Sequence, residues 1–213
     1  MKDIPLFATE LGVASLTLQQ IPYTGCAYIK IQSSADSTEF LRECVAFCKA
    51  AGGQKIYASG HECLCRFAQR TEIWQMRAEI PQIDNTDCLF PVQEHTLDQW
   101  LQIYNDRMKD VTNASCLTKS RAKQFVEAGS AYYVHAEGVL LGIGIAADNK
   151  IQAIVSCQKG AGERVFKTLC RALTGESVCV EVASNNVPAI RLYEKLGFLK
   201  TSVLSTWFDV TNV

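Results

Sequence analysis

The sequence predicts an α+β fold in two domains, and three features carry this prediction. In the second half, apolar periodicities follow the order helix, helix, three antiparallel strands, helix, strand, helix, strand. The first half has the shorter order strand, strand, helix, strand, with a further strand-like segment at Glu72–Ala78. A polar connection bounded by Pro81 and Pro91 separates the halves, so we expect a small α/β domain at residues 1–85 and a larger domain at residues 86–213.

The first domain is expected to open with a hairpin, because two strand-like segments flank a turn that contains Pro22 and Gly25. A helix follows, since Asp36 and Glu39 form a capping-box pattern ahead of apolar residues at helical spacing. Gly52 supplies its end. The predicted strands of this domain are Gly12–Gln19, Ala27–Gln32, Lys55–Ser59 and Glu72–Ala78.

The second domain is expected to open with two helices that begin at the caps Thr96 and Thr118, the second ending at Gly129. Turns at 137–138 and 148–149 then separate three strands. The predicted strands are Ala131–His135, Leu140–Ala146, Ile151–Ser156, Val178–Ser184 and Leu199–Val210, and the later helices are Gly162–Leu173 and Val187–Leu196.

Composition and charge exclude several classes of protein. A hydrophobic content of 48% with 20% charged residues is typical of globular proteins and disfavours disorder. The net charge of −1 gives no field that would attract nucleic acid or an anionic membrane. No window approaches the roughly 18 apolar residues of a membrane helix, and the first residues lack a signal-peptide pattern. We therefore expect a cytoplasmic protein without a nucleic-acid or membrane partner.

The ten cysteines are expected to be reduced and mostly buried, because no secretion signal accompanies them. Cys44 and Cys48, for example, lie four apart on one apolar helix face. A metal site formed by His61, Cys63 and Cys65 is the alternative. That spacing contains no CxxC pair and lacks a second pair downstream, so we predict that no metal is bound.

Residues 181–198, with the sequence EVASNNVPAIRLYEKLGF, carry the most specific pattern in the chain. Asn186 can cap a helix, Ala189 and Tyr193 share one helix face, and Gly197 supplies a left-handed stop. An amphipathic helix with a glycine stop explains the spacing but not the tyrosine. The run resembles the acyl-transfer signature of the GNAT superfamily of acyl-CoA N-acyltransferases, in which a strand is followed by Asn, two residues, Ala and then LYEKLGF.

The resemblance extends over roughly residues 90–210 and implies a GNAT-type mixed central sheet flanked by helices in the second half. It implies acetyl-CoA as co-substrate, and it implies that Tyr193 protonates the departing thiolate. That role suits a phenol, because an ordinary tyrosine with a pKa of about 10 stays protonated at neutral pH and can donate to a thiolate.

Between a strand and a helix, residues 157–162 (CQKGAG) stand where GNAT enzymes place the pyrophosphate loop, written Arg or Gln, x, x, Gly, x, Gly. Its glycines permit close backbone approach, and Lys159 and Arg164 add positive charge. Cys157 and the acidic Glu163 depart from the pattern, and a plain turn of small residues is the alternative. By resemblance, the cofactor-binding residues are Ile154, Val155, Ser156, Cys157, Gln158, Lys159, Gly160, Ala161, Gly162, Glu163, Asn186 and Ala189.

No general base stands out. His135, Glu137 and Glu181 are candidates, but each also has a structural interpretation as a strand-end histidine, a turn residue and a solvent-facing strand carboxylate. Residues 104–114 join the two opening helices, where GNAT proteins form part of the acceptor pocket. This segment is polar and mixed in charge, which permits a small-molecule or peptide amine as acceptor and selects none.

Two functions from different classes follow. The first is an N-acetyltransferase that moves an acetyl or short acyl group from acyl-CoA to an amine. The alternative is a non-catalytic GNAT-fold module that senses acyl-CoA or another ligand, favoured by Cys157, Glu163 and the lack of an evident general base. We expect residues 1–85 to be a divergent, non-catalytic half-copy, since 29–56 and 154–180 both connect strand, helix and strand over similar lengths. Chance agreement is the alternative, and a homodimer is left open.

Overall fold

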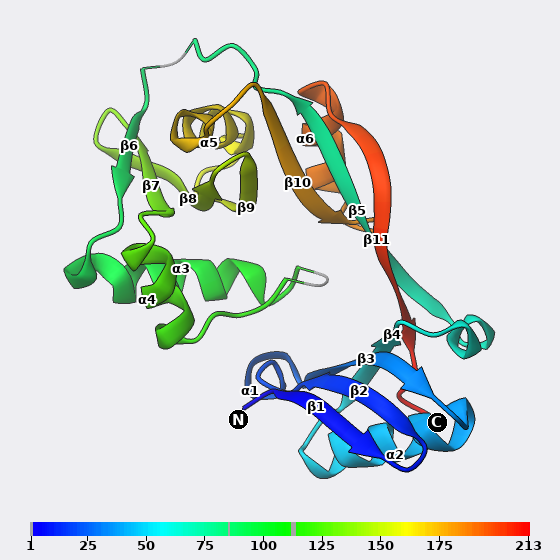
Figure 1. Ribbon diagram of the computed structural model, residues 1–213. Coiled ribbons are helices and arrows are strands. Elements are labelled where there is room, and N and C mark those ends of the chain that lie inside the picture. The colour runs from blue at the N-terminus through cyan, green and yellow to red at the C-terminus, as the bar shows by residue number, and fades with distance from the viewer. Residues whose placement is uncertain (1, 85, 112–113) are drawn as a thin grey trace. The chain divides into compact units, whose positions relative to one another are not determined.

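The computed structural model describes residues 2–84, 86–111 and 114–213. These residues form two compact units, Met1–Ile73 with Val203–Val213, and Trp74–Ser202. Figure 1 shows the elements of both. The boundaries between the units fall within β5 (Gln69–Glu79) and within β11 (Leu199–Asp209), whereas the sequence predicts one boundary after residue 85. The C-terminal segment joins the first unit because Val210 is part of its core.

The first unit is a sheet with one long helix packed on it. Its strands follow the order β1-β2-β3-β4-β11, and all neighbours are antiparallel except β3 and β4. Beyond the predicted elements, the structure adds β1, the short helix α1 within the hairpin connection and the 3-10 helix η1. The elements are β1 (Ile4–Thr9), β2 (Gly12–Thr17), α1 (Ile21–Thr24), β3 (Cys26–Ser34), α2 (Ser37–Ala50), β4 (Lys55–Ser59) and η1 (Glu62–Arg66).

Helix α2 connects the parallel strands β3 and β4 and buries its apolar face against them. Asp36 caps it by accepting hydrogen bonds from the backbone N–H groups of Thr38 and Glu39, as the sequence predicts. The Glu39 carboxylate instead pairs with Arg42 at 2.9 Å. Phe40, which is fully buried, lies in the core between α2 and the sheet.

The second unit contains a mixed sheet with helices on both faces. Its strands follow the order β5-β10-β9-β8-β7-β6. The pairs from β6 to β9 are antiparallel, and β9 and β10 are parallel. The elements are β6 (Cys88–Pro91), η2 (Glu94–Thr96), α3 (Leu97–Met108), α4 (Lys119–Glu127), β7 (Ala131–Ala136), β8 (Val139–Ala147), β9 (Lys150–Ser156), α5 (Gly162–Leu169), η3 (Cys170–Ala172), β10 (Ser177–Ala183) and α6 (Val187–Lys195).

The helices of this unit pack on two apolar cores, one on each face of the sheet. Along β9, Ala153 and Val155 pack with α3 and α4, while Ile154 packs with α5 and α6, as alternation along a strand requires. Figure 1 shows α5 on one side of β7–β9 and α3 with α4 on the other. The α+β prediction is thereby confirmed.

Helix α5 lies close to the sheet because β8 carries two glycines beneath it. A Cβ added to Gly142 would lie 2.3 Å from the carbonyl oxygen of Val155 and 2.8 Å from Val165 of α5. A Cβ added to Gly144 would lie 2.4 Å from Leu169, also of α5. Since α5 follows the 157–162 loop directly, these glycines set the position of that loop.

Candidate functional site

Within the described residues, the parallel strands β9 and β10 are paired near their starts and not beyond. Cys179 is opposite Lys150, and its backbone N–H donates to the carbonyl of Asn149 at 2.8 Å. Beyond that pair no ladder joins the two strands within the described residues, whereas the other edge of β9 is paired with β8 as far as Ser156. Figure 1 shows β9 and β10 side by side in the second unit. The β10-facing edge of 154–156 is therefore free to pair with an extended ligand.

The 157–162 loop follows this open edge and leads into α5. The Cys157 N–H donates to the carbonyl of Leu141 at 2.8 Å, which fixes the start of the loop to β8. Gly160 has a φ of +80°, a left-handed conformation that favours glycine. The backbone N–H groups at the start of α5 have no acceptor within the helix, and Ala161 offers no side-chain cap. Such an end attracts anions.

The charged residues around the loop have definite partners. The Glu163 carboxylate lies 2.6 Å from Nζ of Lys195 and 3.4 Å from Nζ of Lys167, and the hydrogen bond from Lys195 is the main cause that lowers the pKa of Glu163. The Arg164 guanidinium binds both oxygens of Asp87, at 2.6 and 3.0 Å. Arg164 therefore does not supply the free cation that the sequence suggests.

Two further cations lie near the loop. Lys159 is exposed and has no side-chain partner among the described residues. Burial raises the pKa of the Cys157 thiol, and the positive charge of Arg107 opposes this rise. Arg107 belongs to the last turn of α3, so a helix distant in sequence brings a guanidinium toward the position where the family pattern has Arg or Gln. No local sequence signal could have indicated this neighbour.

Tyr193 lies on α6 among aromatic residues of the α5/α6 core. Its ring is 6.2 Å from that of Phe166 and 5.4 Å from that of Phe198, and its side chain shares a core cluster with Ile154 of β9. Burial raises the pKa of Tyr193 to about 12. Its hydroxyl has no hydrogen-bond partner within the described residues. A protonated donor without an internal acceptor therefore borders the core beneath β9.

A family model described as FR47-like protein matches residues 156–207, from the end of β9 into β11. No curated protein matches the chain. A functionally unknown conserved protein from Staphylococcus epidermidis has a similar structure, with a TM-score of 0.60 and 12% identity over 97% of this chain and 93% of that one.

Two similar structures are named by activity. One is a GCN5-related N-acetyltransferase from Sphaerobacter thermophilus, with a TM-score of 0.55 and 11% identity over 92% of this chain and 76% of that one. The other is an acetyltransferase of the GNAT family from Colwellia psychrerythraea, with a TM-score of 0.52 and 12% identity over 96% of this chain and 84% of that one. The chain has the GNAT fold. The resemblance expected from residues 181–198 is confirmed at the level of the fold.

Within this GNAT fold, helix α6 has the predicted local structure. The Asn186 side chain accepts a hydrogen bond from the Ala189 N–H at 3.3 Å and so caps the helix. Gly197 ends it with a φ of +83°. The cap is thus confirmed, while contacts of Asn186 and Ala189 with a cofactor stay a prediction.

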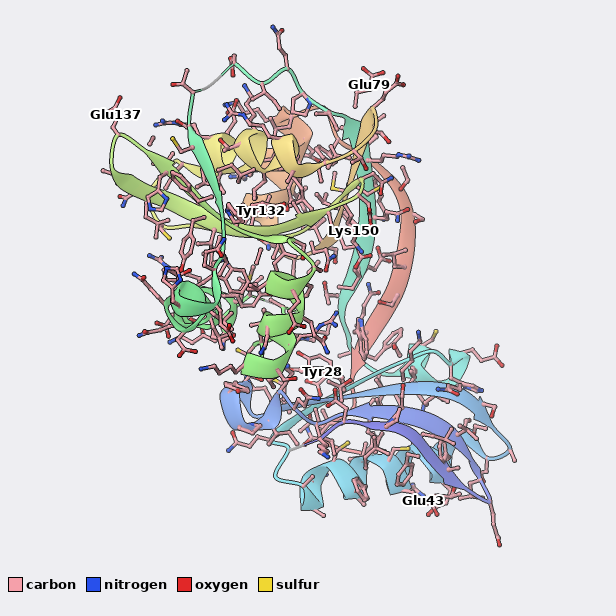
Figure 2. All side chains as sticks on the ribbon, turned by 60° about the vertical axis from the view of Figure 1, so that its left-hand side comes forward. Tyr28, Glu43, Glu79, Tyr132, Glu137 and Lys150 are labelled. Atoms are coloured by element: carbon pink, nitrogen blue, oxygen red, sulfur yellow. The ribbon has the colours of Figure 1, made fainter. Side chains whose placement is uncertain are left out.

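The three candidate bases have the structural surroundings that the sequence suggests. Glu181 pairs with Lys150 at 2.5 Å. Figure 2 shows Glu137 at the tip of the turn between β7 and β8, where its φ is +51°. His135 packs beside Phe90 with ring centroids 5.7 Å apart, and its buried Nδ1 has no partner within the described residues. None of these contacts identifies a base.

The remaining expectations concern the acceptor segment, metals and membranes. Asn105 fixes the end of the α3–α4 connection, exchanging hydrogen bonds of 2.7 and 3.0 Å with the backbone of Leu117, while residues 112 and 113 lie outside the described residues. His61 caps η1 by accepting from the Cys63 N–H. Across the described ranges, no group of three or more His, Cys, Asp or Glu is placed to hold a metal ion, and no helix is long and apolar enough to cross a membrane.

Proposed function

We propose that this protein transfers an acetyl or another short acyl group from acyl-CoA to an amine on a small molecule or peptide. The shared location of three features carries the proposal. The unpaired edge of β9, the uncapped start of α5 and the protonated Tyr193 all belong to one half of the GNAT fold. Each suits a different part of an acyl-CoA: an extended amide-containing arm, a pyrophosphate and a thioester.

The residues fit acyl-CoA in the following way. Backbone groups of 154–156 would hold the pantetheine arm by strand addition, and a backbone N–H there would polarise the thioester carbonyl. Gly160 and Gly162 would admit the pyrophosphate to the N–H groups of α5, with Lys159 adding positive charge. Bound acyl-CoA would supply the acyl group and the thiolate leaving group.

Tyr193 would then act as general acid. The amine nitrogen forms a bond to the carbonyl carbon, the carbon–sulfur bond breaks, and the phenolic proton passes to the sulfur while the amine loses a proton to water. Because burial keeps the pKa of Tyr193 near 12, its hydroxyl is protonated at neutral pH and ready to donate.

A binding module without turnover is the second candidate, favoured by the contacts of Glu181. Its carboxylate is held by Lys150 and so is not free to take a proton from an amine. A single pair of variants separates the two functions. Tyr193→Phe keeps the ring and removes the proton donor, and Tyr23→Phe removes the hydroxyl of an exposed tyrosine in α1 as the control.

For an enzyme, we expect Tyr193→Phe to lower kcat about 100-fold or more while the Kd for acetyl-CoA changes less than about twofold. Calorimetry gives the Kd, and release of free thiol from acetyl-CoA with a panel of amines gives kcat. Binding without thiol release from any amine would favour the sensing module. If wild-type protein neither binds millimolar acetyl-CoA nor releases thiol, the transferase and a sensor of acyl-CoA both fail, and only a module for another ligand is left. The non-catalytic role of residues 1–85 stays a separate prediction.

A further inference from the structure

Glu163 occupies the first turn of α5, where an acid should repel a bound phosphate, yet it is engaged by lysines. Its carboxylate is 2.6 Å from Lys195, the last residue of α6, and 3.4 Å from Lys167, one turn further along α5. The Glu163 side chain is 31% exposed and Lys167 is 19% exposed, whereas Lys195 is 70% exposed, so solvent screens the pair with Lys195 more than the pair with Lys167. Lys167 also lies 3.4 Å from Asp84.

These contacts remove the electrostatic objection to an anion at the start of α5. Lys195 and Lys167 offset the single negative charge of Glu163, and the lowered pKa keeps that carboxylate ionised at neutral pH. The backbone N–H groups at the helix start remain available because Glu163 is directed to the lysines rather than to its own helix end. The acid is thus a structural partner within the site.

The same ion pair joins the two helices whose relative position would determine the reaction. Helix α5 begins at the glycine loop, and α6 carries Tyr193 two residues before Lys195. Between these helices the neighbouring contacts are apolar. The Phe166 and Tyr193 rings are 6.2 Å apart, and Leu192 lies 3.4 Å from where a Cβ on Gly162 would stand. Apolar contacts permit small sliding movements that a directed ion pair resists.

We propose that Glu163 is a positioning residue, whose ion pair with Lys195 fixes the last turn of α6 against the first turn of α5 and so holds Tyr193 at a set distance from the glycine loop. This inference rests on the proposed function. The simpler view is that the negative charge of Glu163 only weakens the binding of CoA. Removing the charge lowers turnover under the first view and tightens binding under the second.

The test uses Glu163→Gln, Lys195→Gln and the double variant, with acetyl-CoA as the probe. We expect each single variant to lower kcat about three- to tenfold, because small displacements of a reacting group reduce the rate steeply. The double variant should be no slower than the slower single variant, since both remove one interaction. The Kd for acetyl-CoA should change less than about twofold, and Lys195→Arg, which keeps the ion pair, should keep wild-type turnover.

Glu39→Gln is the matched control. Glu39 is also an acid in the first turn of a helix and also pairs with a cation, Arg42 at 2.9 Å, but it belongs to α2 of the other unit. Its substitution should leave kcat unchanged, and melting temperatures verify that every variant is folded.

Two results would overturn the proposal while leaving the proposed function intact: unchanged kcat with tighter acetyl-CoA binding in Glu163→Gln, or no change in either quantity. A wild-type protein that neither binds acetyl-CoA nor releases thiol would instead overturn the proposed function and this role together.

Discussion

Gly142 of β8 determines how closely α5 can pack on the sheet, and its replacement by alanine tests that packing. The added Cβ would lie 2.3 Å from the Val155 carbonyl oxygen, and 2.8 and 3.2 Å from the two Cγ atoms of Val165. The Val165 side chain can shift by moving α5. The Val155 carbonyl cannot shift without disturbing β9, because Ile143 and Val155 are partners in the β8–β9 ladder.

The contact with the Val155 carbonyl oxygen determines the expected loss in the free energy of unfolding. Overpacking of a well-packed core costs typically about 1–3 kcal/mol, and we expect Gly142→Ala near the upper end because a backbone atom makes the shortest contact. Displacement of α5 should also weaken acetyl-CoA binding, since the glycine loop leads directly into this helix. Urea unfolding followed by tryptophan fluorescence measures the loss, with Trp100 as a fully buried reporter in the same unit.

Gly162→Ala is the control for Gly142→Ala. A Cβ on Gly162 would come no closer than 3.4 Å to Ser156 or Leu192, an ordinary contact, and alanine has the higher helix propensity at this first residue of α5. We therefore expect its free energy of unfolding to equal or slightly exceed that of the wild type. If Gly142→Ala unfolds within about 0.5 kcal/mol of wild type at an unchanged m-value, the packing argument is refuted.

Two further predictions concern the pH dependence of thiol release and the ion pair between Asp87 and Arg164 of α5. Because burial raises the pKa of Tyr193 from about 10 to about 12, its proton is lost only as pH approaches 12, so thiol release at saturating substrates should not fall between pH 8 and 10. An alkaline fall with a midpoint near 10 would contradict that assignment. Asp87→Asn removes the charge that binds Arg164 at 2.6 and 3.0 Å and should lower Tm by about 2–4 °C. Asp98→Asn, which breaks the exposed pair with Lys119, should change Tm by less than about 1 °C.

The sequence predicts best where local chemistry alone determines structure. Asn186 caps α6 because its side chain reaches an N–H three residues on, and Gly197 ends the helix because its left-handed conformation favours glycine. The strands from β7 to β10 carry apolar residues that no helical period explains, and all are found near their predicted bounds. These features need no knowledge of distant partners.

The sequence does not predict β6 and β1, because these strands depend on pairing with a neighbouring strand. β6 consists of Cys88–Pro91, with three of its four residues exposed, and it forms by pairing with the edge of β7 rather than by burying an apolar face. β1 likewise alternates poorly and is held by pairing with β2. The sequence therefore predicts a connection over the whole of Pro81 to Pro91, although its last residues are strand.

The electrostatics of the candidate site depend on such distant partners most of all. From sequence, Glu163 opposes anion binding and Arg164 favours it. In the structure Lys195, 32 residues away, offsets the first, and Asp87, 77 residues away, binds the second, so both contributions are largely cancelled. The attraction for an anion then rests on the uncapped N–H groups of α5 and on Lys159. Glu163 thus departs from the family pattern in its charge, while the backbone N–H groups at the start of α5 can still bind an anion.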